Sequence, residues 1–127
     1  MLFQNHDEIS DVVPINPDGY TQIFGEKTVY NERILGIDFE VSPSSFLQVN
    51  IAQCEKLYTH IGEYCIEALK SDLEENEEPE EYILLDICSG IGTIGLCLGK
   101  NAKKVIGIEI NEKACEDALR NAKRNNV

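Results

Sequence analysis

A glycine-rich segment near the middle of the chain carries the residues best suited to hold a ligand. Gly90, Gly92 and Gly95 form a G-x-G-x-x-G pattern between a short apolar run and a stretch able to form a helix. Where the Cβ is missing, the backbone can turn tightly and lie against a ligand. Glu109 ends the next apolar run, where its carboxylate could accept hydrogen bonds from the two hydroxyls of a ribose. The pattern indicates an adenosine-containing cofactor; the alternative is a structural turn followed by a surface glutamate.

Two classes of cofactor fit this arrangement. Dinucleotides place a pyrophosphate on the N-terminus of the helix that follows the glycine loop. S-adenosylmethionine has no phosphate and commonly has an acidic residue near its charged amino-acid portion, at the end of the first strand. Asp86, four residues before Gly90, supplies such a carboxylate. Asp86 could instead cap the helix or order the loop, so both cofactor classes stay open on these residues.

The cysteines and histidines do not form a metal-binding pattern. The five cysteines include no CxxC pair, and the chain has only two histidines. No metal-ligand spacing is therefore present. Nor does a nearby cationic residue in the sequence argue for a lowered thiol pKa. We expect reduced cysteines, most of them small core residues, with no metal site and no catalytic residue in the chain.

Short apolar runs and the helices between them must position the candidate residues. Residues 82–87 and 104–110 are typical of buried parallel strands. A short helix is expected over 93–100, and a second helix should begin after its cap, Asn111. The apolar face of that second helix is predicted to hold Ala114, Ala118, Leu119 and Ala122. The order of elements predicts the opening of a doubly wound α/β sheet, with ligands at the carboxyl ends of its strands.

The chain before these strands reads as a β-rich lead-in segment followed by a helix. Residues 1–45 contain prolines and glycines between short apolar pieces, which favours short strands and turns. The serines at 42–45 offer capping hydroxyls for the helix. Apolar positions from Cys54 to Ala68 recur at steps of three and four, which predicts a long amphipathic helix ending near Lys70.

Negative charge is concentrated in an acidic connector at residues 71–81. The chain has a net charge of −12, and seven of the negative charges lie in this connector. Such a run is typical of a solvated linker. The overall charge argues against a nucleic-acid grip formed by this chain alone, because phosphate binding depends on clustered Lys and Arg. With the lead-in at 1–45 set apart, residues 46–127 form the amino-terminal half of an α/β domain.

The predicted sheet is incomplete within the chain. Two parallel strands cannot bury both of their faces or pair both of their edges, and sheets of this kind normally contain several more strands. We expect a domain truncated at Val127, whose exposed edges could lead to self-association. The sequence has no apolar stretch of membrane-spanning length and no secretory signal. We therefore expect an intracellular protein, cytoplasmic or nuclear or both, that does not contact a membrane.

Several segments match the pattern of one enzyme family. They are residues 86–96, 105–109 and 118–122, together with the more specific run Ser42-Pro43-Ser44-Ser45-Phe46-Leu47-Gln48-Val49-Asn50. These segments resemble the RNA uracil-5-methyltransferases, and the tRNA branch of eukaryotes in particular, over roughly residues 24 to 127. The resemblance implies a Rossmann-like S-adenosylmethionine-dependent methyltransferase fold, truncated and preceded by a short β-rich segment.

The resemblance also implies where the cofactor lies. S-adenosylmethionine would be surrounded by Gln48, Cys88 and Glu109, above a loop formed by Gly90, Gly92 and Thr93. Asp86 completes the predicted site from the reasoning on its carboxylate. Bacterial relatives often have an aromatic residue where this chain has Cys88, so a stacking role at this position is not carried over. Gln48 could alternatively serve as a helix-capping amide.

The chemistry that the resemblance implies needs residues that this chain does not contain. The family is understood to add a cysteine thiolate to C6 of a flipped-out uracil, so that C5 can attack the sulfonium methyl before a base removes the C5 proton. The nucleophilic Cys, the base Glu and a Pro-Pro-Arg element lie in the family beyond the second strand and helix. We expect the chain alone to be inactive and RNA, tRNA in particular, to be bound by other parts of the parent protein.

Two other functions remain open on the sequence. The first is a fragment of an NAD-binding Rossmann oxidoreductase, which explains the glycine loop but leaves residues 46–50 without a role. The second is a non-catalytic interaction module built on a truncated methyltransferase fold.

Overall fold

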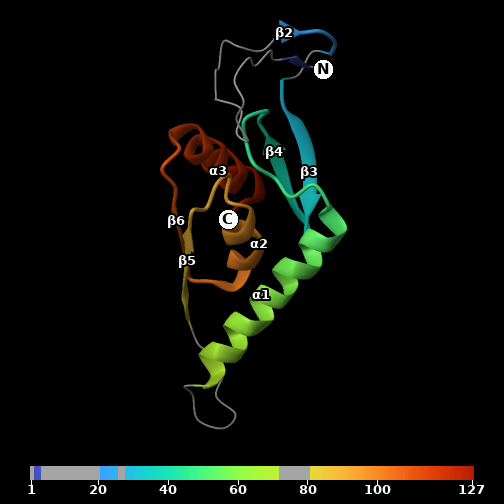
Figure 1. Ribbon diagram of the computed structural model, residues 1–127. Helices are drawn as coiled ribbons and strands as arrows, with labels where there is room; N and C mark the ends of the chain where they lie inside the picture. Colours follow the sequence, from blue (N-terminus) through green and yellow to red (C-terminus); the bar gives the residue numbers. More distant parts are fainter. Residues whose placement is uncertain (1, 4–20, 26–27, 72–80) are drawn as a thin grey trace.

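The chain folds into a β-hairpin, a long helix and a parallel strand pair with two further helices (Figure 1). The computed structural model describes residues 2–3, 21–25, 28–71 and 81–127. In chain order the elements are β1 (Leu2–Phe3), β2 (Thr21–Gln22), β3 (Tyr30–Ile34), β4 (Ile37–Val41), α1 (Ile51–Ser71), β5 (Ile83–Ile87), α2 (Thr93–Leu98), a 3-10 turn (Gly99–Asn101), β6 (Lys104–Ile108) and α3 (Glu112–Asn125).

The described part of the lead-in segment contains the β3–β4 hairpin. The two strands pair antiparallel, with Ile34 opposite Ile37 at the turn. The two turn residues between them, Leu35 and Gly36, have φ angles of 48° and 83°. Positive φ at both positions is typical of the two-residue turns whose backbone twist matches the twist of the flanking strands. The side chains of Ile34 and Phe39 are fully buried, so the hairpin contributes directly to the core. Residues 4–20 lie outside the described part of the chain.

The long amphipathic helix is confirmed, but its predicted cap is wrong. Helix α1 begins at Ile51, and the side chain of Asn50 accepts a hydrogen bond from the amide of Gln53 at 3.1 Å. The serines at 42–45 lie too far upstream to cap it. They form a turn closed by Ser45 N and Ser42 O at 3.0 Å. On the helix, Cys54 and Tyr58 are buried.

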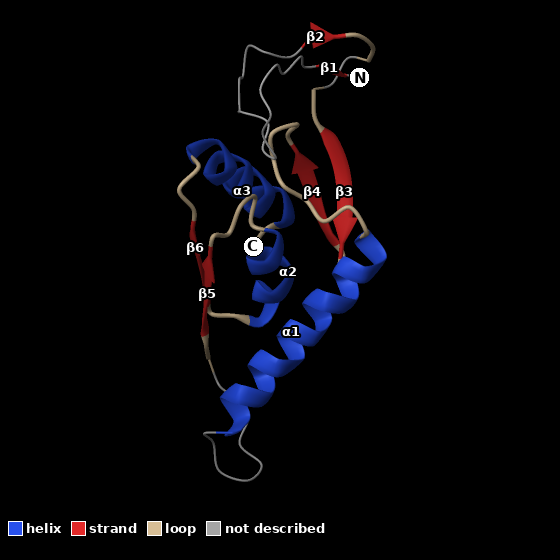
Figure 2. Ribbon diagram, viewed as in Figure 1, coloured by secondary structure: helices blue, strands red, loops and turns tan. Residues whose placement is uncertain are grey.

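The parallel strand pair forms in the predicted order. Its register runs from Ile83 opposite Lys104 to Ile87 opposite Ile108, and α2 packs against both strands. The two strands are covered on one face only, which agrees with the expectation that two parallel strands cannot bury both faces by themselves. One face exposes Ile83, Leu85, Ile87, Ile106 and Ile108. Figure 2 shows β5 and β6 at the outer edge of the molecule, with helices on one side only. The described chain thus supplies one covering layer to a sheet whose apolar pattern calls for two.

Helix α3 buries a polar stripe beside the predicted apolar face, of which Ala114 and Ala122 pack against the core. Its cap is Asn111, as predicted, with the side chain accepting from Ala114 N at 3.2 Å. Leu119 is 62% exposed, whereas the side chains of Asp117 and Asn121 are 0% exposed. The placement of Leu119 on a buried face is therefore wrong. The stripe lies where α3 packs against β4 of the hairpin.

In the part of the chain that the structure describes, no helix combines the length and apolar character needed to cross a membrane. Residues 72–80, which make up most of the acidic connector, lie outside that part.

Candidate functional site

The glycine loop connects β5 to α2 and depends on backbone conformations that favour glycine. Cys88, Gly90 and Gly92 have φ angles of 63°, 55° and 83°. Glycine adopts such angles without steric cost, whereas at Cys88 the left-handed conformation is strained. The loop is pinned at its start by Ser89, whose amide donates to Ile108 O at 3.0 Å and whose carbonyl accepts from Gly92 N at 2.8 Å. The side chain of Cys88 is exposed, and the loop crosses the carboxyl ends of both parallel strands.

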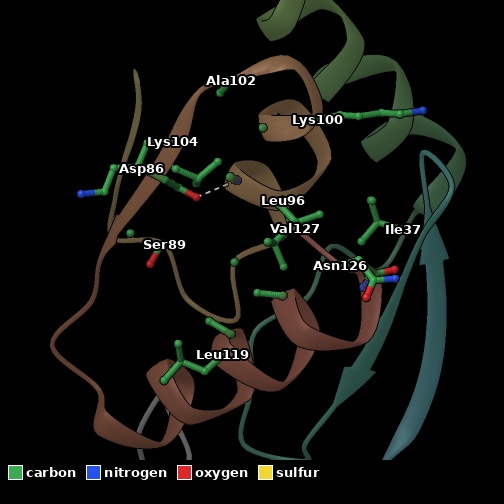
Figure 3. Close-up of a pocket in the computed structure, with 18 of the residues that line it drawn as sticks. Ile37, Asp86, Ser89, Leu96, Lys100, Ala102, Lys104, Leu119, Asn126 and Val127 are labelled. Atoms are coloured by element: carbon green, nitrogen blue, oxygen red, sulfur yellow. Dashed lines mark hydrogen bonds between the residues drawn. The ribbon is translucent and has the colours of Figure 1, made fainter. Parts of the chain in front are cut away.

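Asp86 lies under the loop, with its carboxylate directed at the first turn of α2. Its Oδ2 accepts from Gly95 N at 2.8 Å, and the residue is only 9% exposed (Figure 3, dashed line). Burial raises the pKa of Asp86, while the hydrogen bond from the Gly95 amide acts in the opposite direction. The helix-ordering alternative considered for Asp86 is thereby observed. A cofactor role remains a prediction.

Gly95 is constrained by packing rather than by backbone angle. A Cβ added there would lie 2.9 Å from Asp86 Oδ2 and 3.2 Å from Val105 Cγ1. The absence of that Cβ lets α2 approach β5 and β6 closely enough for the Asp86 bond. Gly90, the first glycine of the pattern, thus suits its position through its backbone angle. Gly95, the third, suits its position because it leaves room for close packing.

Glu109 follows β6 and bonds to the tip of the glycine loop. Its Oε2 accepts from Gly90 N at 2.9 Å, and its Oε1 accepts from Asn111 N at 2.8 Å. These amide donors, that of Asn111 first, lower the pKa of Glu109 and so favour the ionised form. The bond between Glu109 and Gly90 joins two of the residues predicted for the site. Each carboxylate oxygen has a second lone pair that can accept a further hydrogen bond.

Thr93 begins α2 and links the loop to α1. The hydroxyl of Tyr58 donates to Thr93 Oγ1 at 3.2 Å. Burial is the main cause that raises the pKa of Tyr58 to about 12, so the phenol stays a donor at neutral pH. The long helix therefore helps to fix the end of the glycine loop through this bond.

Gln48 is the predicted site residue that the structure does not bring to the loop. Its side chain is exposed in the linker between β4 and α1. None of the hydrogen bonds found in the described residues joins it to the glycine loop, and helix capping falls to Asn50 instead. Its contact with a cofactor remains a prediction.

Asn121 is a residue near the loop that sequence reasoning missed. Its Nδ2 donates to Ile91 O, in the middle of the glycine loop, at 3.4 Å. The signal lay in the spacing of Asp117, Asn121 and Asn125, which puts three short polar side chains on one face of α3. Such a stripe is ordinarily read as solvent-facing, and only the packed hairpin shows otherwise.

One cavity in the described part of the chain overlaps the predicted site only in part. It has a volume of about 1060 Å³ and lies between the parallel strands, α2 and α3 (Figure 3). Asp86, Ser89 and Gly92 line it, but Gln48, Cys88, Gly90 and Glu109 do not. Within the described residues, this cavity therefore includes Asp86 and Gly92 of the predicted site and leaves out its other members.

The five cysteines differ in their surroundings. All five are free thiols, and Cys54 is buried. Burial raises the pKa of the Cys97 thiol to about 12, with the neighbouring Cys54 and Glu55 adding to the effect. No group of three or more potential metal ligands occurs within the described ranges.

Comparison with known proteins gives a consistent set of relatives. No protein-family model matches the chain. An uncharacterized RNA methyltransferase of Enterococcus faecalis is 40% identical over 126 residues, covering 94% of this chain and 25% of that protein. The human tRNA (uracil-5-)-methyltransferase homolog B is 39% identical over 108 residues, covering 85% of this chain and 19% of that protein.

A solved structure supports the same relationship. The tRNA (uracil-54, C5)-methyltransferase of Pyrococcus abyssi, in complex with S-adenosyl-L-homocysteine, matches with a TM-score of 0.66 and 33% identity, over 99% of this chain and 28% of that one. The predicted truncated Rossmann-like methyltransferase fold is confirmed, as is the resemblance to RNA uracil-5-methyltransferases. The chain spans between 19% and 28% of the length of these relatives.

Proposed function

We propose that this chain is the cofactor-binding portion of an S-adenosylmethionine-dependent enzyme that methylates C5 of uracil in RNA, with tRNA as the substrate. The observation that carries the proposal is the bond between Glu109 Oε2 and Gly90 N at 2.9 Å. It fixes an ionised acceptor pair beside the glycine loop, at the carboxyl ends of adjacent parallel strands, where such sheets bind ligands. The relatives' names agree with this activity.

The residues around the loop fit the adenosine half of the cofactor. Gly90 has open space where a Cβ would stand, so a ligand can approach the backbone there. The free lone pairs of the Glu109 carboxylate suit two neighbouring ribose hydroxyls. We propose that Cys88 and Thr93, on the loop, and Gln48, in the linker before α1, complete the surroundings of the cofactor. When bound, S-adenosylmethionine supplies the electrophilic methyl group.

The charge of Asp86 favours S-adenosylmethionine over a dinucleotide. Dinucleotides rely on the positive N-terminal end of the helix after the loop to bind a pyrophosphate. In this chain the Asp86 carboxylate already takes the Gly95 amide in the first turn of α2, which opposes a second anion there. A cofactor with a sulfonium and an ammonium group gains from the same carboxylate. The oxidoreductase alternative is less well supported for this reason.

Methyl transfer itself is proposed to require residues outside these 127. None of the five cysteines has the surroundings of an activated nucleophile, and only Cys88 lies on the loop. RNA contacts are likewise assigned to other parts of the parent protein, because the chain carries a net charge of −12. We place the protein with its RNA in the cytoplasm or the nucleus.

The proposal is tested by calorimetric titration of the full-length native protein. We expect S-adenosylhomocysteine to bind and NAD⁺ not to bind. Glu109→Ala should weaken binding about tenfold or more, as expected for lost charge-assisted bonds. Glu112→Ala, which alters an exposed glutamate in the first turn of α3, serves as the matched control and should bind normally. Binding of NAD⁺ alone would reject the methyltransferase assignment.

A second assay addresses catalysis. The full-length protein should release tritium from C5-labelled uridine in tRNA, whereas the 127-residue chain should not exceed a boiled control. Release by the short chain would show that its own residues suffice for the reaction.

A further inference from the structure

We infer that Asn121 is a positioning residue that couples the β3–β4 hairpin to the glycine loop. In this arrangement the hairpin of the lead-in segment helps to hold the proposed cofactor site in place. The inference deepens the proposed function, on which its ligand-binding consequence rests, and the structural coupling can be measured without any ligand.

The side chain of Asn121 is 0% exposed and bonds to two separate parts of the chain. Its Oδ1 accepts from Glu40 N at 2.9 Å, and its Nδ2 donates to Glu40 O at 3.3 Å. The same Nδ2 donates to Ile91 O at 3.4 Å. One buried amide therefore joins α3, strand β4 and the glycine loop.

Asn125 makes the same kind of contact with β4 but does not reach the loop. Its Oδ1 accepts from Asp38 N at 2.9 Å, and its Nδ2 donates to Asp38 O at 2.9 Å. Asp38 and Glu40 are two residues apart, so their backbone N–H and C=O groups face the same edge of the strand. The two asparagines, four apart on the helix, replace a neighbouring strand along the open edge of β4.

The carbonyl that Asn121 holds is at a sensitive point of the loop. Ile91 stands between Gly90 and Gly92, both at positive φ, where the backbone has the most conformational freedom. The Ile91 side chain is 1% exposed, so the residue is fixed in the core by its side chain and by its carbonyl. Because Gly90 N bonds to Glu109, movement at Ile91 is passed directly to the proposed ribose acceptor.

The third member of the stripe strengthens the same connection. Asp117, also 0% exposed, accepts from Ser45 Oγ through its Oδ2 at 3.0 Å. Ser45 lies three residues before Gln48, on the linker that leaves β4. The stripe on α3 therefore holds both the strand and the linker that carries a predicted cofactor residue.

The experiment compares Asn121→Ala with Asn125→Ala in the full-length native protein. Both variants lose bonds to one residue of β4, so both should lower the melting temperature. Only Asn121→Ala also frees the Ile91 carbonyl. We expect it to accelerate hydrogen exchange at the amides of Gly90 and Gly92 and to weaken S-adenosylhomocysteine binding about tenfold. Asn125→Ala should leave loop exchange unchanged and alter affinity by less than about threefold.

The outcomes separate this inference from the proposed function. Equal effects of the two variants on loop exchange and affinity would overturn it and reduce Asn121 to hairpin packing. If the wild-type protein binds no S-adenosylhomocysteine, the proposed function fails, but selective acceleration at Gly90 and Gly92 still supports the coupling. Should Asn121→Ala not fold, Asn121→Ser keeps a small polar side chain without the reach of the amide, and the same comparison applies.

Discussion

Replacement of Gly95 by alanine tests whether close packing between α2 and the parallel strands sets the geometry under the glycine loop. Gly95 lies inside α2 and is buried. A Cβ there would stand 2.9 Å from Asp86 Oδ2, 3.2 Å from Val105 Cγ1 and 3.4 Å from Asp86 Cβ. The first contact involves the same oxygen that accepts from Gly95 N at 2.8 Å. The added methyl group therefore has to displace the Asp86 carboxylate or move the helix.

The size of the effect follows from two opposed contributions. Alanine is favoured over glycine inside a helix by about 1 kcal/mol. Overpacking a filled site costs roughly 1–3 kcal/mol. The net result is a destabilisation of about 1 kcal/mol, which for a domain of this size lowers the melting temperature by about 3–5 °C. Because Asp86 moves, cofactor affinity should fall as well.

Gly62 provides the matched control. It lies inside α1, and a Cβ there would meet only Leu98 Cδ2, at 3.2 Å. That atom is the end of a rotatable side chain, so Gly62→Ala should raise the unfolding free energy by up to about 1 kcal/mol. We expect thermal and urea unfolding to show a difference of about 2 kcal/mol between the unfolding free energies of the two variants. If Gly95→Ala is as stable as Gly62→Ala, the packing account of the third glycine is refuted.

Two carboxylates should respond to pH in opposite directions. Burial raises the pKa of Asp86, so the ionised carboxylate is disfavoured in the folded chain. The resulting loss of folding stability is absent below the ordinary Asp pKa and fully present above the raised pKa of the folded state. Asp86→Asn should therefore be as stable as wild type or more stable at neutral pH, and it should bind S-adenosylhomocysteine more weakly. Urea unfolding measures the stability and calorimetry measures the binding. A large loss of stability at neutral pH would contradict this reasoning. The amides of Asn111 and Gly90 lower the pKa of Glu109, so its stabilising effect is present above the ordinary Glu pKa and is lost as the pH falls through the lower folded-state value. The stability difference between wild type and Glu109→Gln should disappear in acid; a difference that does not vary with pH would show that the ionised form is not the stabilising one.

The order of elements and the glycine loop could be predicted from the sequence because local patterns determine them. The apolar runs around Leu84 and Val105 are short and end at turn residues, so they indicate strands whatever surrounds them. Asn111 is an acceptor immediately before a helical pattern, and it caps that helix as expected. Likewise, the glycines at 90 and 92 stand where the structure has positive φ.

The failures share a physical cause, which is dependence on contacts between distant segments. The serines at 42–45 were assigned to a helix cap because they precede the helix, yet Ser45 binds Asp117, 72 residues away. Leu119 was grouped with Ala114 and Ala122, which do pack against the core, yet it is exposed. Asp117 and Asn121 are buried in its place because the open edge of β4 offers backbone groups for hydrogen bonds. An edge strand and its partner cannot be recognised from the periodicity of the helix alone.

The two bonds of Glu109 bear on how the proposed site could achieve affinity. A surface glutamate has several rotatable bonds, and fixing it on ligand binding costs conformational entropy of up to about 1.5 kcal/mol. In this chain both oxygens already hold backbone amides, those of Gly90 and Asn111, so the carboxylate is oriented before a ligand arrives. Gly90 is in turn restrained through Ile91 by Asn121 and the hairpin. A free lone pair on each oxygen can then accept from a ligand at little further cost in conformational entropy. The lead-in hairpin thereby contributes to the affinity of the proposed site for its ligand, although none of the hairpin residues belongs to the predicted site.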